Sequence, residues 1–272
     1  MFLAIIILLS LASTIGLTLL CSLDWWFAPL IFIGSLLVII LLFLLIVWIM
    51  TLCFPKRDDY KPKKFLGAII KSVCRALVTF FRIKPTVENF ELLNQKRPML
   101  IVSNHQSLLD PVIKLTKMDD LTVTAIMKEE IMKIPVVGRY LKVAGYYPLN
   151  RGNDREALKV IRKSIDRIVD NKSLIVYPEG TRSKTLDIGE YKDGTFRIAQ
   201  KAKCPICVVV VDNDYKIKKN WPFKKTKTLI KVCKVIEYSE IENLKTNEIR
   251  EMVEQITKQG LEEARLQYKW LK

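Results

Sequence analysis

The chain has 272 residues, and its 44 lysines and arginines outnumber 28 acidic residues, for a formal net charge of +16. Residues 1–53 contain Asp24 as their only charged side chain, so residues 54–272 hold 44 basic against 27 acidic residues, a net charge of +17. This excess indicates an anionic partner: a lipid surface, a phosphorylated substrate or a nucleic acid. The six cysteines are scattered through the chain, which argues against a small protein held together by disulfides.

Two apolar segments open the chain, residues 2–20 and 30–54. Each is close to the roughly 20 residues that a helix needs to cross a hydrocarbon core. Trp25 and Trp26 lie between them, as aromatic residues do at a membrane interface. We expect a two-helix transmembrane hairpin over residues 1–54. A cleaved signal peptide is the alternative for the first segment, although it lacks the basic start of such peptides.

Basic residues follow the second apolar segment directly: Lys56, Arg57, Lys61, Lys63 and Lys64. Because such residues stay on the cytoplasmic side, we expect an integral membrane protein whose remaining domain lies on the cytoplasmic face. From Lys64 to Arg82, apolar residues recur at helical spacing between lysines and arginines. This pattern predicts a basic amphipathic helix within residues 55–84 that lies in the lipid headgroup layer. The alternative is a helix that packs on the rest of its own domain, and one helix can do both.

The remainder, residues 85–272, alternates between strand and helix patterns. Apolar runs predict strands at residues 87–93, 99–102, 121–127, 144–149, 173–177, 205–211 and 228–236. Helical patterns lie at residues 128–134, 154–170, 194–201 and 245–272. Strands that alternate with helices, mostly without hairpin signals, predict an α/β fold with a mostly parallel sheet flanked by helices.

Cys204 and Cys207 have the spacing of a metal or redox pair. No second pair accompanies them, and a run of four valines follows Cys207. We therefore interpret both as buried cysteines of a strand, and we predict no metal site.

His105 is the only histidine in the chain, and it follows the predicted strand at residues 99–102. An imidazole can take and give a proton near neutral pH. Asp110 lies five residues further on, and residues five apart on a helix point about 140° away from each other. The two side chains can meet only if His105 lies in the strand-to-helix turn, outside a helix that begins near Ser107. Two interpretations stand: a catalytic pair, or a histidine that satisfies a loop while Asp110 caps a helix or faces solvent.

A second loop, Glu179 to Arg182, follows the predicted strand at residues 173–177. Gly180 lets the backbone approach a ligand closely, and Thr181 offers a hydroxyl and an amide. The planar guanidinium of Arg182 suits a phosphate, and Lys192 adds positive charge nearby. The alternative is a solvated turn in which Arg182 pairs with Glu179.

Together these blocks resemble the glycerolipid acyltransferase family, specifically its 1-acylglycerol-3-phosphate (lysophosphatidate) acyltransferases. The Asn-His-x4-Asp block of that family is matched by Asn104, His105 and Asp110, and its Pro-Glu-Gly-Thr-Arg block by Pro178 to Arg182. Its glycine-to-arginine block is matched more loosely by Gly145 to Arg151, and its proline before an aliphatic strand by Pro205. The resemblance spans about residues 85–215.

The resemblance implies transfer of an acyl chain from acyl-CoA or acyl carrier protein to the sn-2 hydroxyl of 1-acylglycerol 3-phosphate, giving phosphatidic acid. His105 would be the general base, and Asp110 would orient the imidazole and stabilise its cation, with the substrate hydroxyl in place of the serine of a triad. No acyl-enzyme, metal or bound cofactor is implied. The implied substrate-binding residues are Arg151, Glu179, Gly180, Thr181 and Arg182, with Lys128 and Lys192 as further cations.

Three alternatives remain beside this interpretation. The same chemistry could act on glycerol 3-phosphate or on another lysophospholipid. A hydrolase is a second possibility because Ser103 and Ser107 flank His105, but the chain has no Gly-x-Ser-x-Gly elbow. A membrane-tethered nucleic-acid-binding protein is suggested by charge alone, and its basic residues are dispersed. We therefore expect membrane lipid, lysophosphatidic acid and a thioester donor as partners, and no nucleic acid.

Overall fold

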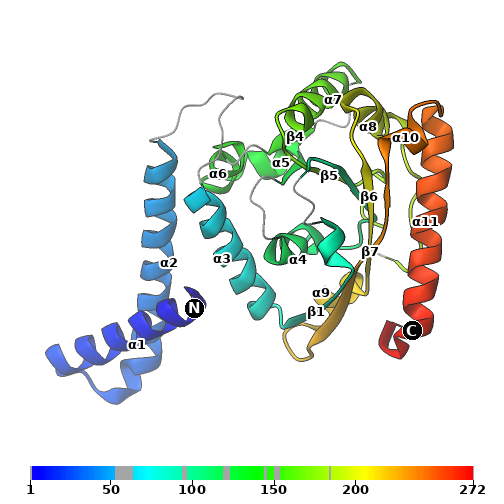
Figure 1. The fold of residues 1–272 in the computed structure, drawn as a ribbon. Coiled ribbons are helices and arrows are strands. Elements are labelled where there is room, and N and C mark those ends of the chain that lie inside the picture. Colours follow the sequence, from blue (N-terminus) through cyan, green and yellow to red (C-terminus); the bar gives the residue numbers. More distant parts are fainter. Residues whose placement is uncertain are drawn as a thin grey trace. The chain divides into compact units, whose positions relative to one another are not determined.

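The computed structural model describes residues 2–52, 64–93, 97–118, 123–143, 146–149, 154–183 and 185–271. The chain forms two compact units (Figure 1). The first contains residues 1–62 and 130–145, and the second contains residues 63–129 and 146–272.

The first unit is built on two apolar helices, α1 (Phe2–Leu20) and α2 (Ala28–Leu52), with a single 3-10 turn between them, η1 (Trp25–Phe27). The helices contact each other, and the Ser35 hydroxyl lies 3.3 Å from the Ser10 carbonyl oxygen. Within the described residues, Trp25–Met50 is long and apolar enough to cross a membrane, whereas Ala4–Leu20 is apolar but shorter. The two predicted helices and their turn are therefore present, and the crossing of a membrane by both stays a prediction.

The second unit is organised on a seven-stranded sheet of order β1-β7-β6-β2-β5-β3-β4. The strands are β1 (Ile83–Glu88), β2 (Leu100–Ser103), β3 (Thr124–Lys128), β4 (Tyr147–Leu149), β5 (Leu174–Val176), β6 (Ile206–Asp212) and β7 (Thr226–Ile236). Every neighbouring pair is parallel except β6 and β7. The predicted α/β fold with a mostly parallel sheet is confirmed.

Helices cover both faces of this sheet (Figure 1). The longer ones are α3 (Lys64–Phe80), α4 (Asp110–Lys117), α7 (Asp154–Val169), α8 (Arg197–Ala202) and α11 (Thr246–Gln267). The short helices of this unit are α9 (Ile217–Asn220) and α10 (Tyr238–Ile241), with 3-10 turns η2 (Phe90–Leu93), η3 (Asp193–Thr195), η4 (Asp214–Lys216) and η5 (Lys269–Leu271). Residues 130–145 of the first unit contain α6 (Val137–Val143) and all but the first residue of α5 (Glu129–Met132). Figure 1 shows α11 running beside β6 and β7, with α3 and α4 on the other side of the sheet.

The main core lies where the central strands meet α7, α8 and α11. β2, β5 and β6 are buried along their whole lengths, as expected for strands covered on both faces. Leu100, Val208, Phe196 and Val253 belong to one buried cluster. Burial of each such aliphatic or aromatic side chain contributes about 1.5–3 kcal/mol, so this cluster fixes the strands whose ends carry the site.

Cys204 and Cys207 lie in this buried region, with 3% and 0% of their surface exposed. Burial raises the pKa of the Cys204 thiol to about 11 and that of Cys207 to about 12. Their burial is confirmed, but only Cys207 lies in a strand, because β6 begins at Ile206, two residues after Cys204.

Helix α3 packs on α4 and β1, and the Lys71 ammonium donates a hydrogen bond of 2.7 Å to the Met118 carbonyl. The alternative of a helix packed on its own domain is therefore observed. A position in the lipid headgroup layer stays a prediction.

The strand predicted at residues 87–93 is wrong in its bounds, because β1 runs from Ile83 to Glu88 and η2 follows. Arg82 has a φ of 54° and ends α3, so the chain turns and pairs with β7 earlier than its apolar pattern suggests. Asn89 has the same φ and donates from its amide to the Val232 carbonyl at 3.1 Å, which ends the strand. Asn adopts this left-handed conformation more readily than most residues.

Candidate active site

The turn between β2 and α4 carries His105. β2 ends at Ser103, and the next residue, Asn104, is anchored to the neighbouring strand β6. Its amide donates to the Val211 carbonyl at 2.9 Å and accepts from the Val211 amide at 2.8 Å. Both polar atoms of the Asn104 side chain thus bind the main chain of β6, which fixes the position of the residue before His105.

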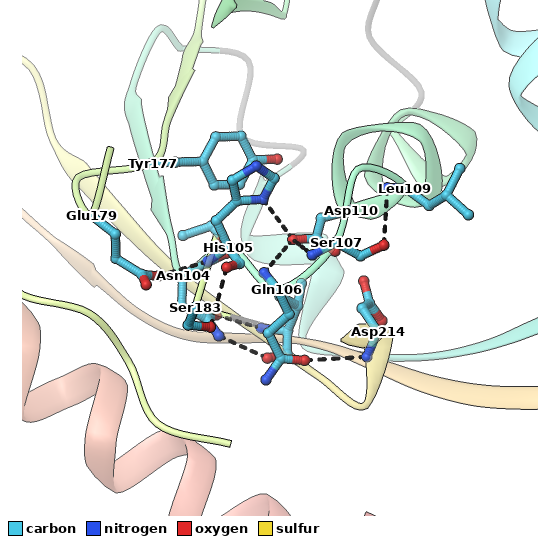
Figure 2. A network of polar contacts seen from close by, with 12 residues as sticks. Asn104, His105, Gln106, Ser107, Leu109, Asp110, Tyr177, Glu179, Ser183 and Asp214 are labelled. Carbon is cyan, nitrogen blue, oxygen red and sulfur yellow. Dashed lines mark hydrogen bonds and ion pairs between the residues drawn. The ribbon is translucent and has the colours of Figure 1, made fainter. Parts of the chain in front are cut away.

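His105 and Asp110 meet as the spacing argument requires (Figure 2). The His105 Nδ1 atom lies 2.7 Å from Asp110 Oδ2, and His105 lies outside the helix. Because Nδ1 faces the carboxylate, Nε2 is the imidazole nitrogen that can serve a substrate. The predicted geometry of the pair is confirmed.

The start of the helix differs from the prediction. α4 begins at Asp110 rather than near Ser107, and its N-cap residue, Leu109, makes no side-chain cap. The reason is that Asp110 Oδ2 also accepts hydrogen bonds from the amides of Gln106 at 2.7 Å and Ser107 at 3.0 Å. These bonds hold residues 106–109 as a turn, and the Ser107 hydroxyl accepts from the Leu109 amide at 3.2 Å, so Ser107 caps this turn ahead of α4.

The surroundings of the pair favour a charged carboxylate beside a mostly buried imidazole. Asp110 is fully buried and the His105 side chain is 14% exposed. Burial acts to raise the pKa of Asp110, but the hydrogen bond from His105 and the charge of Lys114 outweigh it, and the pKa lies below its usual value. The Tyr177 ring stacks on the imidazole with 4.3 Å between ring centroids.

The loop after β5 is tied to the main chain of His105. The Glu179 carboxylate accepts from the His105 amide at 2.7 Å and from the Gly189 amide at 2.8 Å. The Ser183 amide donates to the His105 carbonyl at 2.9 Å. Burial is the main reason that the pKa of Glu179 lies above its usual value.

The alternative pairing of Glu179 with Arg182 is therefore not formed: within the described part of the chain, both Glu179 carboxylate oxygens face backbone amides.

The residues after Glu179 face outward. Gly180 has a φ of 71°, and a Cβ there would lie 3.3 Å from Lys192 Cε, so glycine lets Lys192 lie across the loop. Thr181, Arg182 and Lys192 are exposed. Thr181 and Lys192 line a pocket of about 470 Å³ whose other walls include Tyr191 and Arg250.

Two predicted substrate-binding residues remain, Lys128 and Arg151. Lys128 is the last residue of β3, at the same carboxyl edge of the parallel sheet as the ends of β2 and β5. Arg151 lies outside the described residues.

Two buried residues that were not predicted from the sequence, Lys114 and Asp214, contact residues next to the His105–Asp110 pair. Lys114 is fully buried, donates to the Ser103 hydroxyl at 2.7 Å and lies 3.4 Å from the Tyr177 hydroxyl. Burial lowers the pKa of Lys114 to about 8, although the charges of Asp110 and Asp214 oppose the shift. Lys114 follows Asp110 by four residues, one helical turn, which is the signal that could have identified it.

Asp214 is also buried, and its backbone amide donates to Gln106 Oε1 at 3.1 Å. It follows β6, whose carboxyl end reaches the same edge as β2, and that topology could have identified it. Arg250, in contrast, comes from α11 and carries no local signal in the sequence.

Comparison with known proteins agrees with this geometry. Residues 84–212 match the model of a family described as Acyltransferase. The chain is 32% identical over 169 residues to a 1-acyl-sn-glycerol-3-phosphate acyltransferase of Saccharomyces cerevisiae, covering 60% of this chain and 54% of that protein. It is 33% identical over 144 residues to the human 1-acyl-sn-glycerol-3-phosphate acyltransferase beta, covering 53% and 51%. The chain thus spans about half the length of these curated relatives.

A solved structure supports the same relationship. The crystal structure of the 1-acyl-sn-glycerophosphate (LPA) acyltransferase PlsC from Thermotoga maritima superposes with a TM-score of 0.65 at 26% identity, covering 81% of this chain and 87% of that one. The resemblance inferred from the sequence blocks is confirmed in the match of residues 84–212 to the acyltransferase family model.

Proposed function

We propose that this protein is a 1-acylglycerol-3-phosphate O-acyltransferase. It transfers a fatty acyl chain from a thioester donor to the sn-2 hydroxyl of lysophosphatidic acid and forms phosphatidic acid. The observation that carries the proposal is the 2.7 Å contact between His105 Nδ1 and Asp110 Oδ2, which leaves Nε2 as a base. The names of the relatives support the choice of acceptor.

In the proposed reaction, His105 Nε2 removes the proton of the sn-2 hydroxyl as its oxygen attacks the thioester carbon. Asp110 stabilises the imidazolium that forms, as the acid of a triad does. The carbon–sulfur bond then breaks, and the departing thiolate takes the proton from Nε2. The imidazole is restored, and neither an acyl-enzyme nor a metal or bound cofactor is needed.

The acceptor phosphate is proposed to bind the outward-facing cations and donors of the loop after β5: Thr181, Arg182 and Lys192. Their exposure beside a loop that is tied to His105 supports this assignment. Lys128, at the carboxyl edge of the sheet, and Arg151 stay proposed as further cations. Glu179, predicted to bind substrate, makes contacts that favour a role in holding the loop against His105.

For the whole protein, we propose residues 1–54 as a transmembrane hairpin, residues 55–84 as an interfacial segment and residues 85–272 as the acyltransferase domain on the cytoplasmic face. A membrane-bound enzyme meets a lipid acceptor in the bilayer and an anionic donor, acyl-CoA or acyl carrier protein, from the aqueous side. The apolar span Trp25–Met50 and the basic balance of the chain support this arrangement.

The test is an acceptor and donor panel on the purified full chain in lipid. We expect phosphatidic acid from lysophosphatidic acid with either acyl-CoA or acylated carrier protein, and much less product from glycerol 3-phosphate or lysophospholipids with larger headgroups. His105→Ala should abolish product formation while the chain stays folded by circular dichroism. Near-normal transfer by His105→Ala would show the proposed base to be wrong, and free fatty acid released without an acceptor would favour a hydrolase.

A further inference from the structure

A second buried carboxyl group lies behind the proposed catalytic pair. Asp214 begins η4 after β6, and 1% of its surface is exposed. Gln106, the residue after His105, holds it in place: Gln106 Oε1 accepts from the Asp214 amide at 3.1 Å, and Gln106 Nε2 lies 3.2 Å from Asp212 Oδ1. Figure 2 shows the Asp214 side chain directed toward the turn of Ser107 and Asp110.

Three carboxyl oxygens at this position lack a hydrogen-bond donor among the described residues: Oδ1 and Oδ2 of Asp214 and Oδ1 of Asp110. Buried oxygens without a donor are costly, so two such groups side by side indicate a shared proton. One carboxyl group, when protonated, donates to the other and satisfies both. The two carboxyl groups are close enough for the charge of Asp110 to raise the pKa of Asp214, and Figure 2 shows both beside the same turn.

The surroundings decide which carboxyl group holds the proton. Asp110 accepts from three donors, the His105 imidazole and the amides of Gln106 and Ser107, and these bonds favour its anion. Asp214 has no such donor, and burial followed by the charge of Asp110 holds its pKa well above the usual range. The proton therefore resides on Asp214.

The neighbouring charges are consistent with this assignment. Lys114, the buried cation of the cluster, is bound to the Ser103 hydroxyl at 2.7 Å. Asp212 is paired with Arg265, whose Nε atom lies 2.7 Å from Asp212 Oδ2. With Asp214 neutral, Lys114 faces the ionised carboxylate of Asp110. The Glu179 carboxylate, whose charge also acts on Lys114, accepts hydrogen bonds from the His105 and Gly189 amides.

We propose that Asp214 is a positioning residue for the acyl-transfer reaction: as a neutral acid it donates a hydrogen bond to Asp110 Oδ1 and so keeps Oδ2 aimed at His105 Nδ1. The inference rests on the proposed function, because it assigns Asp214 to the support of that same base. Without this donor, the Asp110 carboxylate is held through Oδ2 alone, and the contact that fixes the imidazole tautomer weakens.

The kinetic test compares Asp214→Asn with Asp214→Leu. The amide of Asn can donate the same hydrogen bond and cannot ionise, whereas Leu fills the space without donating. We expect Asp214→Asn to retain kcat within about threefold and Asp214→Leu to lose about tenfold or more in kcat at unchanged KM, the range typical of outer partners of a functional residue. Asp214→Ala replaces Asp214→Leu if the latter does not fold.

A second readout is independent of acyl transfer. Because His105 is the only histidine, nitrogen-15 NMR of the histidine-labelled full chain reports its tautomer and pKa without assignment. We expect a proton fixed on Nδ1 in the wild type and in Asp214→Asn, and a mixture of tautomers in Asp214→Leu. An unchanged tautomer in Asp214→Leu, or equal kinetic losses in both variants, would overturn the inference. If the wild type transfers an acyl chain to none of the acceptors while the tautomers behave as expected, the proposed function alone is contradicted.

A separate observation concerns the turn between β6 and β7. Phe223 is 86% exposed and Phe80, at the end of α3, is 53% exposed. Trp221, two residues before Phe223, contacts Phe80: its indole donates to the Phe80 carbonyl at 2.9 Å, and its ring lies 5.2 Å from that of Phe80.

Positive charge surrounds these aromatic rings. Residues 216–227 contain six lysines and no acidic residue, and the exposed ones are Lys218, Lys219, Lys224, Lys225 and Lys227. No ion pair involves these five lysines in the described part of the chain.

Exposed aromatic rings flanked by lysines are complementary to anionic lipid headgroups. We infer that this turn is a second membrane-contacting surface, which docks on anionic lipid beside the end of α3. The inference deepens the proposed function, since it names how the acyltransferase domain rests on its membrane.

Limited trypsin digestion of the intact chain in lipid nanodiscs tests this inference, because trypsin cleaves after the lysines of the turn itself. Cleavage at residues 218–225 should be at least about fivefold slower with phosphatidylglycerol than with phosphatidylcholine alone, and high salt should restore it. Phe223→Ser should weaken the protection. Lys245, the exposed N-cap residue of α11, is the control site and should be cleaved equally in both lipids, because α10 and α9 lie at opposite ends of this unit in Figure 1. Equal cleavage of the turn in both lipids would overturn the inference, whatever the acyltransferase activity.

Discussion

The loop after β2 and the loop after β5 present opposite surroundings to their polar side chains. The imidazole of His105 and the carboxylate of Asp110 are mostly or fully buried, and a single oxygen of Asp110 accepts three hydrogen bonds. Arg182 and Lys192, in contrast, are exposed and form no ion pair within the described part of the chain. Groups that move a proton must be held before the substrate arrives, whereas groups that bind a phosphate must exchange water for it.

The largest expected effect comes from breaking the buried loop at its carboxylate. Asp110→Asn can keep one oxygen at the position that accepts these three hydrogen bonds, but it loses the negative charge that stabilises the imidazolium. We expect kcat to fall by about 100- to 10,000-fold, the range of general base catalysis and of a lost triad acid. Steady-state kinetics with lysophosphatidic acid measures it. A rise in KM alone, with kcat preserved, would contradict the proposed role of Asp110.

Glu179 joins the two loops, so its removal tests whether they act as one. Glu179→Ala leaves the buried amide of His105 without an acceptor, which costs about 1–3 kcal/mol of stability. We expect a lower unfolding midpoint in denaturant together with a fall in kcat of about tenfold. Glu179→Gln, which keeps one acceptor oxygen, is the matched control and should lose less of both. Equal values for the two variants would mean that the carboxylate does not hold His105.

The exposed loop should respond in binding rather than in chemistry. Arg182→Ala and Lys192→Ala remove charges that the proposed function assigns to the acceptor phosphate. We expect KM for lysophosphatidic acid to rise about tenfold in each, with kcat within about twofold, since a lost ground-state contact acts on KM. Stability should stay unchanged because both side chains are exposed. A variant with unchanged KM and reduced kcat would place its side chain in the chemical step instead.

The smallest expected effect is a difference in pH dependence between two lysines. Burial lowers the pKa of Lys114 to about 8, whereas an unfolded lysine titrates near 10.4. Between these values the unfolded state binds more protons, so this group adds a contribution to the free energy of unfolding that increases from about pH 8 to pH 10. Denaturant titrations across this range should show a smaller rise for Lys114→Met than for the wild type. Lys192→Met, at the exposed loop, should follow the wild type.

The features of the two loops that depend on residues close together in the chain are the ones that the sequence predicts. The His105–Asp110 contact was accessible because a buried strand, a single histidine and a spacing of five leave one geometry in which the two side chains meet. The parallel sheet was accessible from the alternation of strands and helices. The helix start at Asp110 was not, because the capture of two backbone amides by a carboxylate has no periodic signature.

Contacts between distant segments mark the limit of prediction. Asp214 and Gln106 lie far apart in the chain, and their hydrogen bond depends on β6 lying beside β2. The antiparallel pairing of β6 with β7 is set by the turn that carries Trp221 and its lysines, which gave no hairpin signal. Such contacts follow from topology, so they become predictable only once the order of strands is known.

The strand order has a consequence for biosynthesis. Ile83 pairs with Thr226, and β2 lies between β5 and β6, so neither early strand has a sheet neighbour until the second half of the chain has been made. Sheets with such distant partners fold slowly, because long loops must close first. The apolar helices α1 and α2 leave the ribosome well before that point. In the proposed arrangement, the N-terminus is delivered to a bilayer while the sheet of the second unit is still unpaired, and that sheet then folds at the membrane surface.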